Sequence, residues 1–96
     1  MATALWIAHV TVTNEDAYMK YAAIASEAIA QHGGTFLARG GQAIQKEGRA
    51  HPRNVVARFP SLEAANACYD SEIYQEALSY ARGASDRDLV LVEEFD

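Results

Sequence analysis

Apolar and β-branched residues fill positions 3–13 almost without a break, a pattern that predicts a β-strand. Helical spacing of apolar side chains follows over 16–32. Asn14 stands where an N-cap is needed, and acidic residues occupy the first turn, where the helix dipole favours them. A glycine pair at 33–34 predicts the end of the helix, and a second strand is predicted over 35–39.

The same order of elements repeats in the second half of the chain. A polar connection over 47–52 follows a predicted strand continuation at 43–46. Ser61 and Ser71 are predicted to cap two helical pieces that are separated by a break at 70–71. The remaining predicted ranges are 54–59 for the third strand, 61–82 for the interrupted helix and 89–92 for the last strand.

The order β-α-β-β-α-β predicts a ferredoxin-like α+β fold, in which four antiparallel strands carry two helices on one face. With right-handed connections, the expected strand order is 4-1-3-2. The length of 96 residues suits one domain, which we expect to span residues 1–96. The predicted first helix is rich in alanine, and such small side chains are expected to let it lie close on the sheet.

Both faces of the predicted sheet are apolar, whereas a half-exposed sheet shows alternation of apolar and polar residues. In the first strand, Trp6, Ala8, Val10 and Val12 share one parity, and Leu5, Ile7, His9 and Thr11 share the other. The helices can cover only one face, and an exposed apolar patch of several hundred Å² is rare on a monomer. We therefore expect a homodimer whose sheets pack face to face. The alternative is a cover formed by a longer loop or the C-terminus.

Composition narrows the classes of partner. Half of the chain is apolar, and the net charge of −5 argues against binding to nucleic acid or an anionic membrane surface. The single cysteine, Cys68, excludes an intrachain disulfide and is predicted to be buried, which fits a cytoplasmic protein. The chain shows no signal peptide and no apolar run long enough to cross a bilayer.

Three strand residues are candidates for chemistry. If the strands keep regular alternation, His9, Arg39 and Arg58 share the face opposite the helices. Arginine binds carboxylates in bidentate fashion and histidine titrates near neutrality, so such a cleft suits a small anionic or enolisable ligand. The structural alternative is that the arginines form ion pairs at the dimer interface and that His9 is a hydrogen-bonded core residue. One bulge would reverse the parity.

Other motifs add little. Gly40 and Gly41 follow Arg39 and could bring backbone N–H groups close to a ligand, although such a pair more often marks a bend. His32 and His51 lack metal-ligand spacing with any cysteine or histidine, so neither a metal nor a cofactor is expected. The tyrosines of the second helical region are predicted to serve packing. They are Tyr69, Tyr74 and Tyr80.

Several motifs occur together in one family. They are residues 6–10 (WIAHV), 33–41 (GGTFLARGG), 59–65 (FPSLEAA), 69–75 (YDSEIYQ) and 90–93 (VLVE). The chain resembles domain of unknown function family 1330 over nearly its full length, departing from its pattern at Ile73, where the family usually has glutamate. The resemblance implies a dimeric α+β barrel with a pocket between sheet and helices in each protomer. The resemblance also identifies Arg39 as a candidate site residue, because Arg39 belongs to one of the shared motifs. The superfamily includes cofactor-free monooxygenases, isomerases, dehydratases and haem enzymes, but the family has no settled activity.

Two hypotheses for function remain open from the sequence. The first is an enzyme that acts without a cofactor on a small acidic or enolisable metabolite, with His9 as acid/base and Arg39 with Arg58 as anion holders. The second is a dimer that binds small molecules without turnover, or a stress-related one. A haem-associated or oxygen-using protein is a third alternative, for which His9 would be the only strand histidine available as a ligand.

Overall fold

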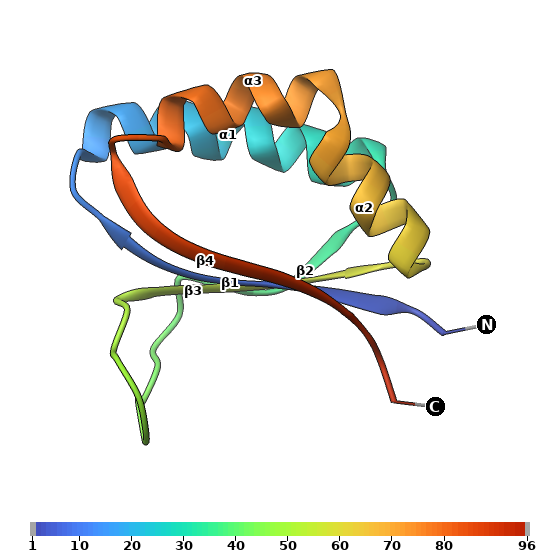
Figure 1. Cartoon of the computed structure of the whole chain (residues 1–96), viewed down its shortest axis with the longest axis horizontal. Helices are drawn as coiled ribbons and strands as arrows, with labels where there is room; N and C mark the ends of the chain where they lie inside the picture. Colours follow the sequence, from blue (N-terminus) through green and yellow to red (C-terminus); the bar gives the residue numbers. More distant parts are fainter. Residues whose placement is uncertain (1, 96) are drawn as a thin grey trace.

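The computed structural model describes residues 2–95 and shows an antiparallel sheet with helices on one face (Figure 1). The predicted break at Ser71 is confirmed, since the second helical region consists of two helices. The elements in chain order are β1 (Ala4–Val12), α1 (Glu15–Gln31), β2 (Thr35–Arg39), β3 (Arg53–Phe59), α2 (Leu62–Asp70), α3 (Glu72–Ala81) and β4 (Ser85–Glu93).

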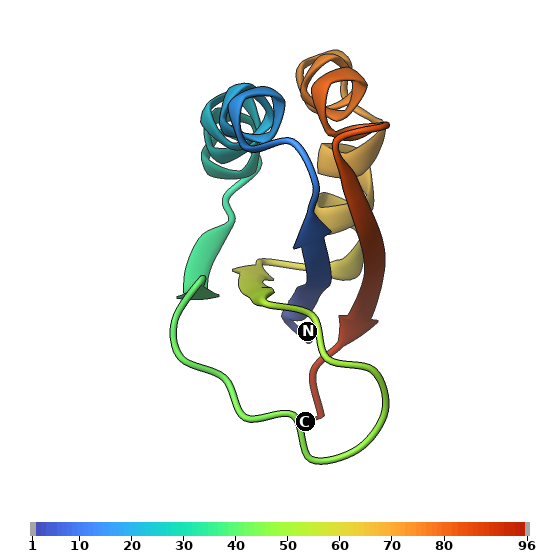
Figure 2. The same ribbon diagram turned by 90° about the vertical axis from the view of Figure 1, so that its left-hand side faces the viewer.

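The ferredoxin-like arrangement predicted from the element order is confirmed. The sheet runs β2-β3-β1-β4, which is the expected order 4-1-3-2 counted from the other edge. α1 and α3 lie side by side above the sheet, and α2 descends toward it (Figures 1 and 2). The predicted caps are present, because Asn14 Oδ1 accepts from Ala17 N at 3.2 Å and Ser61 Oγ accepts from Ala64 N at 3.0 Å. Each satisfies a backbone donor at a helix start.

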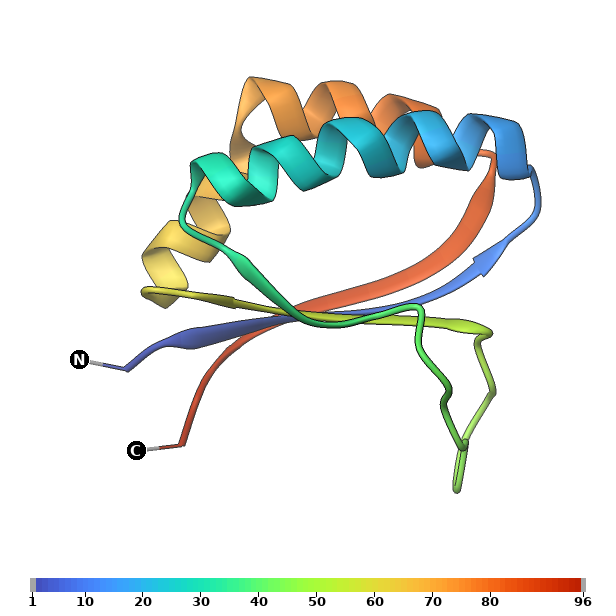
Figure 3. The ribbon, with the colours of Figure 1, turned by 180° about the vertical axis from the view of Figure 1, so that it is seen from behind.

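Two predicted boundaries are wrong. β4 begins at Ser85, earlier than the expected 89, because its polar first half still pairs with β1 as far as Val12. No strand forms over 43–46. Residues 40–52 instead form a loop that extends away from the helices, below the sheet in Figure 3.

The helix-facing side of the sheet carries the core. Trp6 lies opposite Ala57 on β3 and Leu91 on β4, so these side chains share one face. Trp6 is 1% exposed and packs its ring against those of Phe59 and Tyr74, at centroid distances of 5.7 and 5.0 Å. Cys68 is fully buried, as predicted, and burial raises the pKa of its thiol to about 11.

The opposite face of the sheet, here called the open face, is apolar in its middle. Ile7 lies opposite Val56 on β3 and Val90 on β4, and Leu5 lies opposite Val92. Val90 is 53% exposed, so neither a helix nor the 40–52 loop covers this strand within the described residues. The expected shortage of cover on one sheet face is therefore present.

Candidate functional site

A bulge in β2 decides where Arg39 points. Phe36 pairs with Ala57 and Arg39 pairs with Val55, with a register shift between Phe36 and Ala38. Ala57 and Val55 both belong to the core face, so the shift brings Phe36 and Arg39, three residues apart, to the helix side. In a regular strand, residues three apart would face opposite sides.

The prediction that one cleft holds all three candidate residues is therefore wrong. His9 pairs with Asn54 and Asp88, and Arg58 pairs with Leu5, which places both on the open face as expected. Arg39 lies on the other face because of the bulge. A catalytic role for His9 and a ligand-binding role for Arg58 stay predictions. The sheet separates both residues from the cavity described next.

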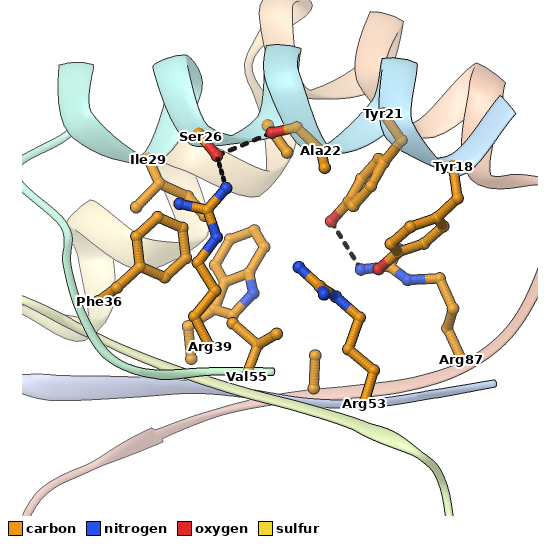
Figure 4. Close-up of a pocket in the computed structure, with 13 residues that line it drawn as sticks. Tyr18, Tyr21, Ala22, Ser26, Ile29, Phe36, Arg39, Arg53, Val55 and Arg87 are labelled. Atoms are coloured by element: carbon orange, nitrogen blue, oxygen red, sulfur yellow. Dashed lines mark hydrogen bonds between the residues drawn. The ribbon is translucent and has the colours of Figure 1, made fainter. Parts of the chain in front are cut away.

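A cavity lies between α1 and the sheet, and three arginines enter it (Figure 4). It encloses about 370 Å³, including the space at its open mouth. The closed part of this space is small, so a ligand of several heavy atoms has to displace a lining side chain, among which Arg39 is exposed. The lining residues are Trp6, Ala8, Tyr18, Tyr21, Ala22, Ala25, Ser26, Ile29, Phe36, Arg39, Arg53, Val55 and Arg87.

Arg39 is held at the cavity by α1. Its Nη2 donates to Ser26 Oγ at 2.9 Å, and Ser26 donates its own proton to the carbonyl of Ala22 at 2.7 Å. The guanidinium also stacks over the Phe36 ring at 4.6 Å. These contacts leave the remaining N–H groups of Arg39 without a bond to a carboxylate among the described residues.

Arg53 and Arg87 enter the cavity from the sheet, one on each side of Val10. Arg53 lies over the Tyr18 ring at 5.7 Å, and Arg87 lies over the Tyr21 ring at 4.6 Å. The Nε atoms of both arginines are buried and have no hydrogen-bond partner among the described residues. A buried donor without a partner costs about 1–3 kcal/mol, which a ligand acceptor would relieve.

The electrostatic character of the cavity opposes that of the whole chain. The protein carries a net charge of −5, yet three of its eight Lys and Arg residues line the cavity and no Asp or Glu does. The ion pairs of the described residues lie elsewhere: Arg49 with Asp86, His51 with Asp88, and Arg58 with Glu94. The cavity is thus a concentrated positive region with aromatic walls.

Two tyrosines connect the cavity to the core. The hydroxyls of Tyr21 and Tyr74 are 2.8 Å apart, and Arg87 Nη2 donates to both, at 2.7 and 3.3 Å. Burial raises the pKa of Tyr21 and of Tyr74. Both hydroxyls therefore keep their protons near neutral pH, and neither serves as a base there.

The open-face candidates are engaged with their own neighbours. His9 Nδ1 lies 2.7 Å from Asn54 Oδ1. Arg58 donates from Nε to Glu94 Oε1 at 2.6 Å and from Nη2 to Oε2 at 3.2 Å. These hydrogen bonds, followed by one from Thr3, lower the pKa of Glu94.

Substitution Arg58→Met is expected to bring the pKa of Glu94 back toward the ordinary glutamate range, because the largest cause of its depression is lost. A carboxyl with a depressed pKa contributes stability above its unfolded pKa, and this is lost as pH falls through the folded value. The variant should therefore be less stable than the wild type near neutrality, and this difference should vanish at pH values below the folded pKa of Glu94. Carboxyl NMR titration checks the pKa, and an unchanged Glu94 value would contradict the assignment.

The glycines after Arg39 have a conformational role. Gly40 adopts φ +69°, a left-handed conformation that favours glycine, and its N–H donates to the Asn54 carbonyl at 3.1 Å. A Cβ at Gly40 would lie 3.1 Å from the Arg53 guanidinium, whereas one at Gly41 would meet nothing within 4 Å. Neither glycine lines the cavity. A backbone contact from them to a ligand stays a prediction.

Sequence reasoning missed Arg53 and Arg87. Arg53 lies between the predicted connection over 47–52 and the predicted strand over 54–59, and Arg87 precedes the predicted last strand over 89–92. The signal was present in β4, where Ser85, Arg87, Leu89 and Leu91 alternate with exposed residues. Extending the alternation of the apolar end backward through the charged residues would have placed Arg87 on the core face.

Residues 2–95 offer neither a metal site nor a membrane-spanning helix. No cluster of three His, Cys, Asp or Glu side chains there could hold a metal ion. None of the described helices has the length and apolar character needed to cross a bilayer.

The fold and the cavity define a ferredoxin-like α+β protein with an arginine-lined cavity between helix and sheet. The sequence matches the model of the family described as Domain of unknown function (DUF1330) over residues 3–95, so the chain belongs to this family. Among curated proteins, none matches the sequence.

Solved structures share the fold at low identity. The RPA0582 protein of Rhodopseudomonas palustris, of unknown function, superposes with a TM-score of 0.79 at 17% identity, covering 99% of this chain and 82% of that one. SnoaB, a cofactor-independent oxygenase from Streptomyces nogalater, gives 0.70 at 11% identity, covering 100% and 96%. A dimeric protein of unknown function and ferredoxin-like fold from Bacteroides fragilis gives 0.59 at 11%, covering 98% of each chain.

Proposed function

We propose that this protein binds a small anionic molecule in the cavity between α1 and the sheet. The observation that carries the proposal is the meeting of Arg39, Arg53 and Arg87 in an aromatic cavity that no carboxylate lines. Like charges at close range repel, so this cluster destabilises the empty protein and is stabilised when an anion enters. The aromatic walls suit a ligand with a flat apolar body.

The proposed unit is a homodimer of this single domain, joined through the open face. Support comes from the uncovered apolar strands around Val90 and from the dimeric neighbour of the same fold. In such a dimer, the cavity of each copy would lie on the side of the sheet away from the partner. Each copy would then hold its ligand with its own residues.

The residues that line the cavity support binding without turnover more strongly than acid/base catalysis. No His, Asp or Glu lines the cavity, and His9, the expected base, lies on the opposite face. The second candidate is catalysis on an enolisable ligand, which is favoured by donors able to stabilise an enolate and by the cofactor-independent oxygenase among the neighbours. Mass spectrometry of an enolisable ligand after incubation in D₂O, with and without protein, separates the two, because enolisation exchanges its α-hydrogens for deuterium and oxygenation adds oxygen, whereas binding alone leaves the mass unchanged.

Benzoate at about 100 times its dissociation constant is expected to stabilise the protein by about 2.7 kcal/mol, since it binds only the folded state. For a chain of this size, the melting temperature should rise by roughly 10 °C or more. Arg53→Met should raise the melting temperature of the empty protein by a few degrees and weaken benzoate binding by about tenfold or more, because a charge-assisted hydrogen bond is lost.

The controls are chosen for charge and for position. Benzamide has the same ring as benzoate and no charge, so it should leave the melting temperature unchanged at equal ionic strength. Arg58→Met removes an arginine on the open face and should retain the full benzoate shift. The proposed function is abandoned if benzoate and acetate stabilise the protein no more than benzamide does.

A further inference from the structure

The direction of the Tyr21 hydroxyl proton follows from the burial of Tyr74. Tyr74 is 0% exposed, so its proton needs an acceptor within the protein. Among the described residues, its hydroxyl contacts only the Tyr21 oxygen and Arg87, and arginine has no acceptor. The Tyr74 proton therefore points to Tyr21, because the opposite arrangement would leave the Tyr74 proton unpaired in the closed core, whereas the Tyr21 hydroxyl borders the cavity, where a ligand can accept its proton.

The Tyr21 oxygen is then occupied by two donors. It accepts from Tyr74 at 2.8 Å and from Arg87 Nη2 at 2.7 Å, and these match the two lone pairs of a hydroxyl oxygen. Its own proton has no partner among the described residues. The Tyr21 hydroxyl lies at the cavity beside the arginines (Figure 4), so a ligand there is the acceptor open to that proton.

The cavity is consequently rich in donors and poor in acceptors. Its arginines only donate, the Ser26 proton is committed to the Ala22 carbonyl, and the Tyr21 lone pairs are occupied. The side-chain acceptors left in the lining are the Tyr18 hydroxyl and one lone pair of Ser26, against the donors of three arginines. A neutral acid would bring an O–H group that finds few acceptors in this space, whereas its anion would accept from the donors. The site should therefore favour the ionised form of an oxygen acid over the neutral form.

We propose that Tyr21 donates its hydroxyl proton to an anionic oxygen of the ligand, and that the ligand class is a phenolate, enolate or carboxylate bound as the ion. Tyr74 acts as a positioning residue that directs the Tyr21 proton toward the cavity. This inference rests on the proposed function, because it assigns the ligand to the same cavity.

The test follows the ionisation of 4-nitrophenol, whose phenolate absorbs visible light, in the presence of the whole protein. We expect the pKa of the bound probe to fall by about 1–2 units, as opposite charge does for a nearby acid. Tyr21→Phe should remove about one unit of that shift, a tenfold loss of preference for the phenolate. Tyr74→Phe should retain more than half of the shift, because Tyr21 still donates but loses one polarising neighbour.

A matched control and distinct outcomes make the result decisive. Tyr80→Phe deletes a tyrosine hydroxyl outside the cavity and should leave the shift unchanged. An unchanged shift in Tyr21→Phe, or a larger one in Tyr74→Phe, would mean that Tyr21 donates to Tyr74 and would overturn the inference while benzoate binding still supports the proposed function. If neither benzoate nor 4-nitrophenol binds the wild-type protein, both proposals are overturned.

Discussion

Replacing Val90 by aspartate is expected to convert the proposed dimer into a monomer. Val90 lies on the open face of the edge strand β4, opposite Ile7 of β1, and is 53% exposed in the single chain. In a two-fold interface the same residue is buried on both copies, so the substitution introduces two charges without partners. Each such buried charge costs several kcal/mol.

The dimer dissociation constant should rise by at least about a thousandfold, since every 1.4 kcal/mol corresponds to a factor of ten. Sedimentation equilibrium across a range of concentrations measures this constant. Met19→Asp is the matched control, because Met19 is an apolar residue, 64% exposed, on α1 at the other side of the molecule. A wild-type protein that sediments as a monomer at every concentration would remove the dimer from the proposal.

Truncation of Trp6 to alanine is expected to cost about 3–5 kcal/mol of folding free energy, the range for a large aromatic lost from a core. The indole is 1% exposed and its ring neighbours include Phe59, Tyr69 and Tyr74, at 5.7, 6.1 and 5.0 Å. Domains of this kind are stable by about 5–15 kcal/mol, so the variant would lose a large share of the total.

Chemical denaturation of the variant and the wild type under identical conditions gives the difference in unfolding free energy. Trp6→Phe keeps an aromatic ring in the same place and should lose clearly less than the alanine variant. The packing described for Trp6 would be contradicted if alanine lowered the stability by less than about 1.5 kcal/mol.

Local signals were enough to predict most of the fold. Several features reflect patterns or interactions within a few residues of the chain. They are the alternation of side chains along β1, the caps at Asn14 and Ser61, and the break at Ser71. The strand order followed from the repeated βαβ unit and from its handedness. These features could be read without knowing how distant segments pair.

The candidate site depended on pairing between distant segments, and there the prediction was only partly right. Arg39 was identified as a ligand residue, but its face is set by the register shift against β3, which no pattern within 35–39 reveals. The alanines of α1 were expected to bring the helix close to the sheet. Ala22 and Ala25 instead line the cavity, where their small side chains leave room that larger residues would fill.

The bulge in β2 also bears on how related sequences should be compared. Deleting Leu37 would remove the bulge and leave Phe36 and Arg39 two residues apart, so both would stay on the helix side. Regular pairing of all five residues of β2 would instead turn Arg39 to the open face, although the Arg-Gly-Gly motif would be unaltered. The motif alone therefore does not mark a relative that shares the cavity. A relative can place this arginine on the helix side with the present spacing and a bulge, or with one residue fewer and no bulge, so sequence comparison should allow a one-residue gap at Leu37.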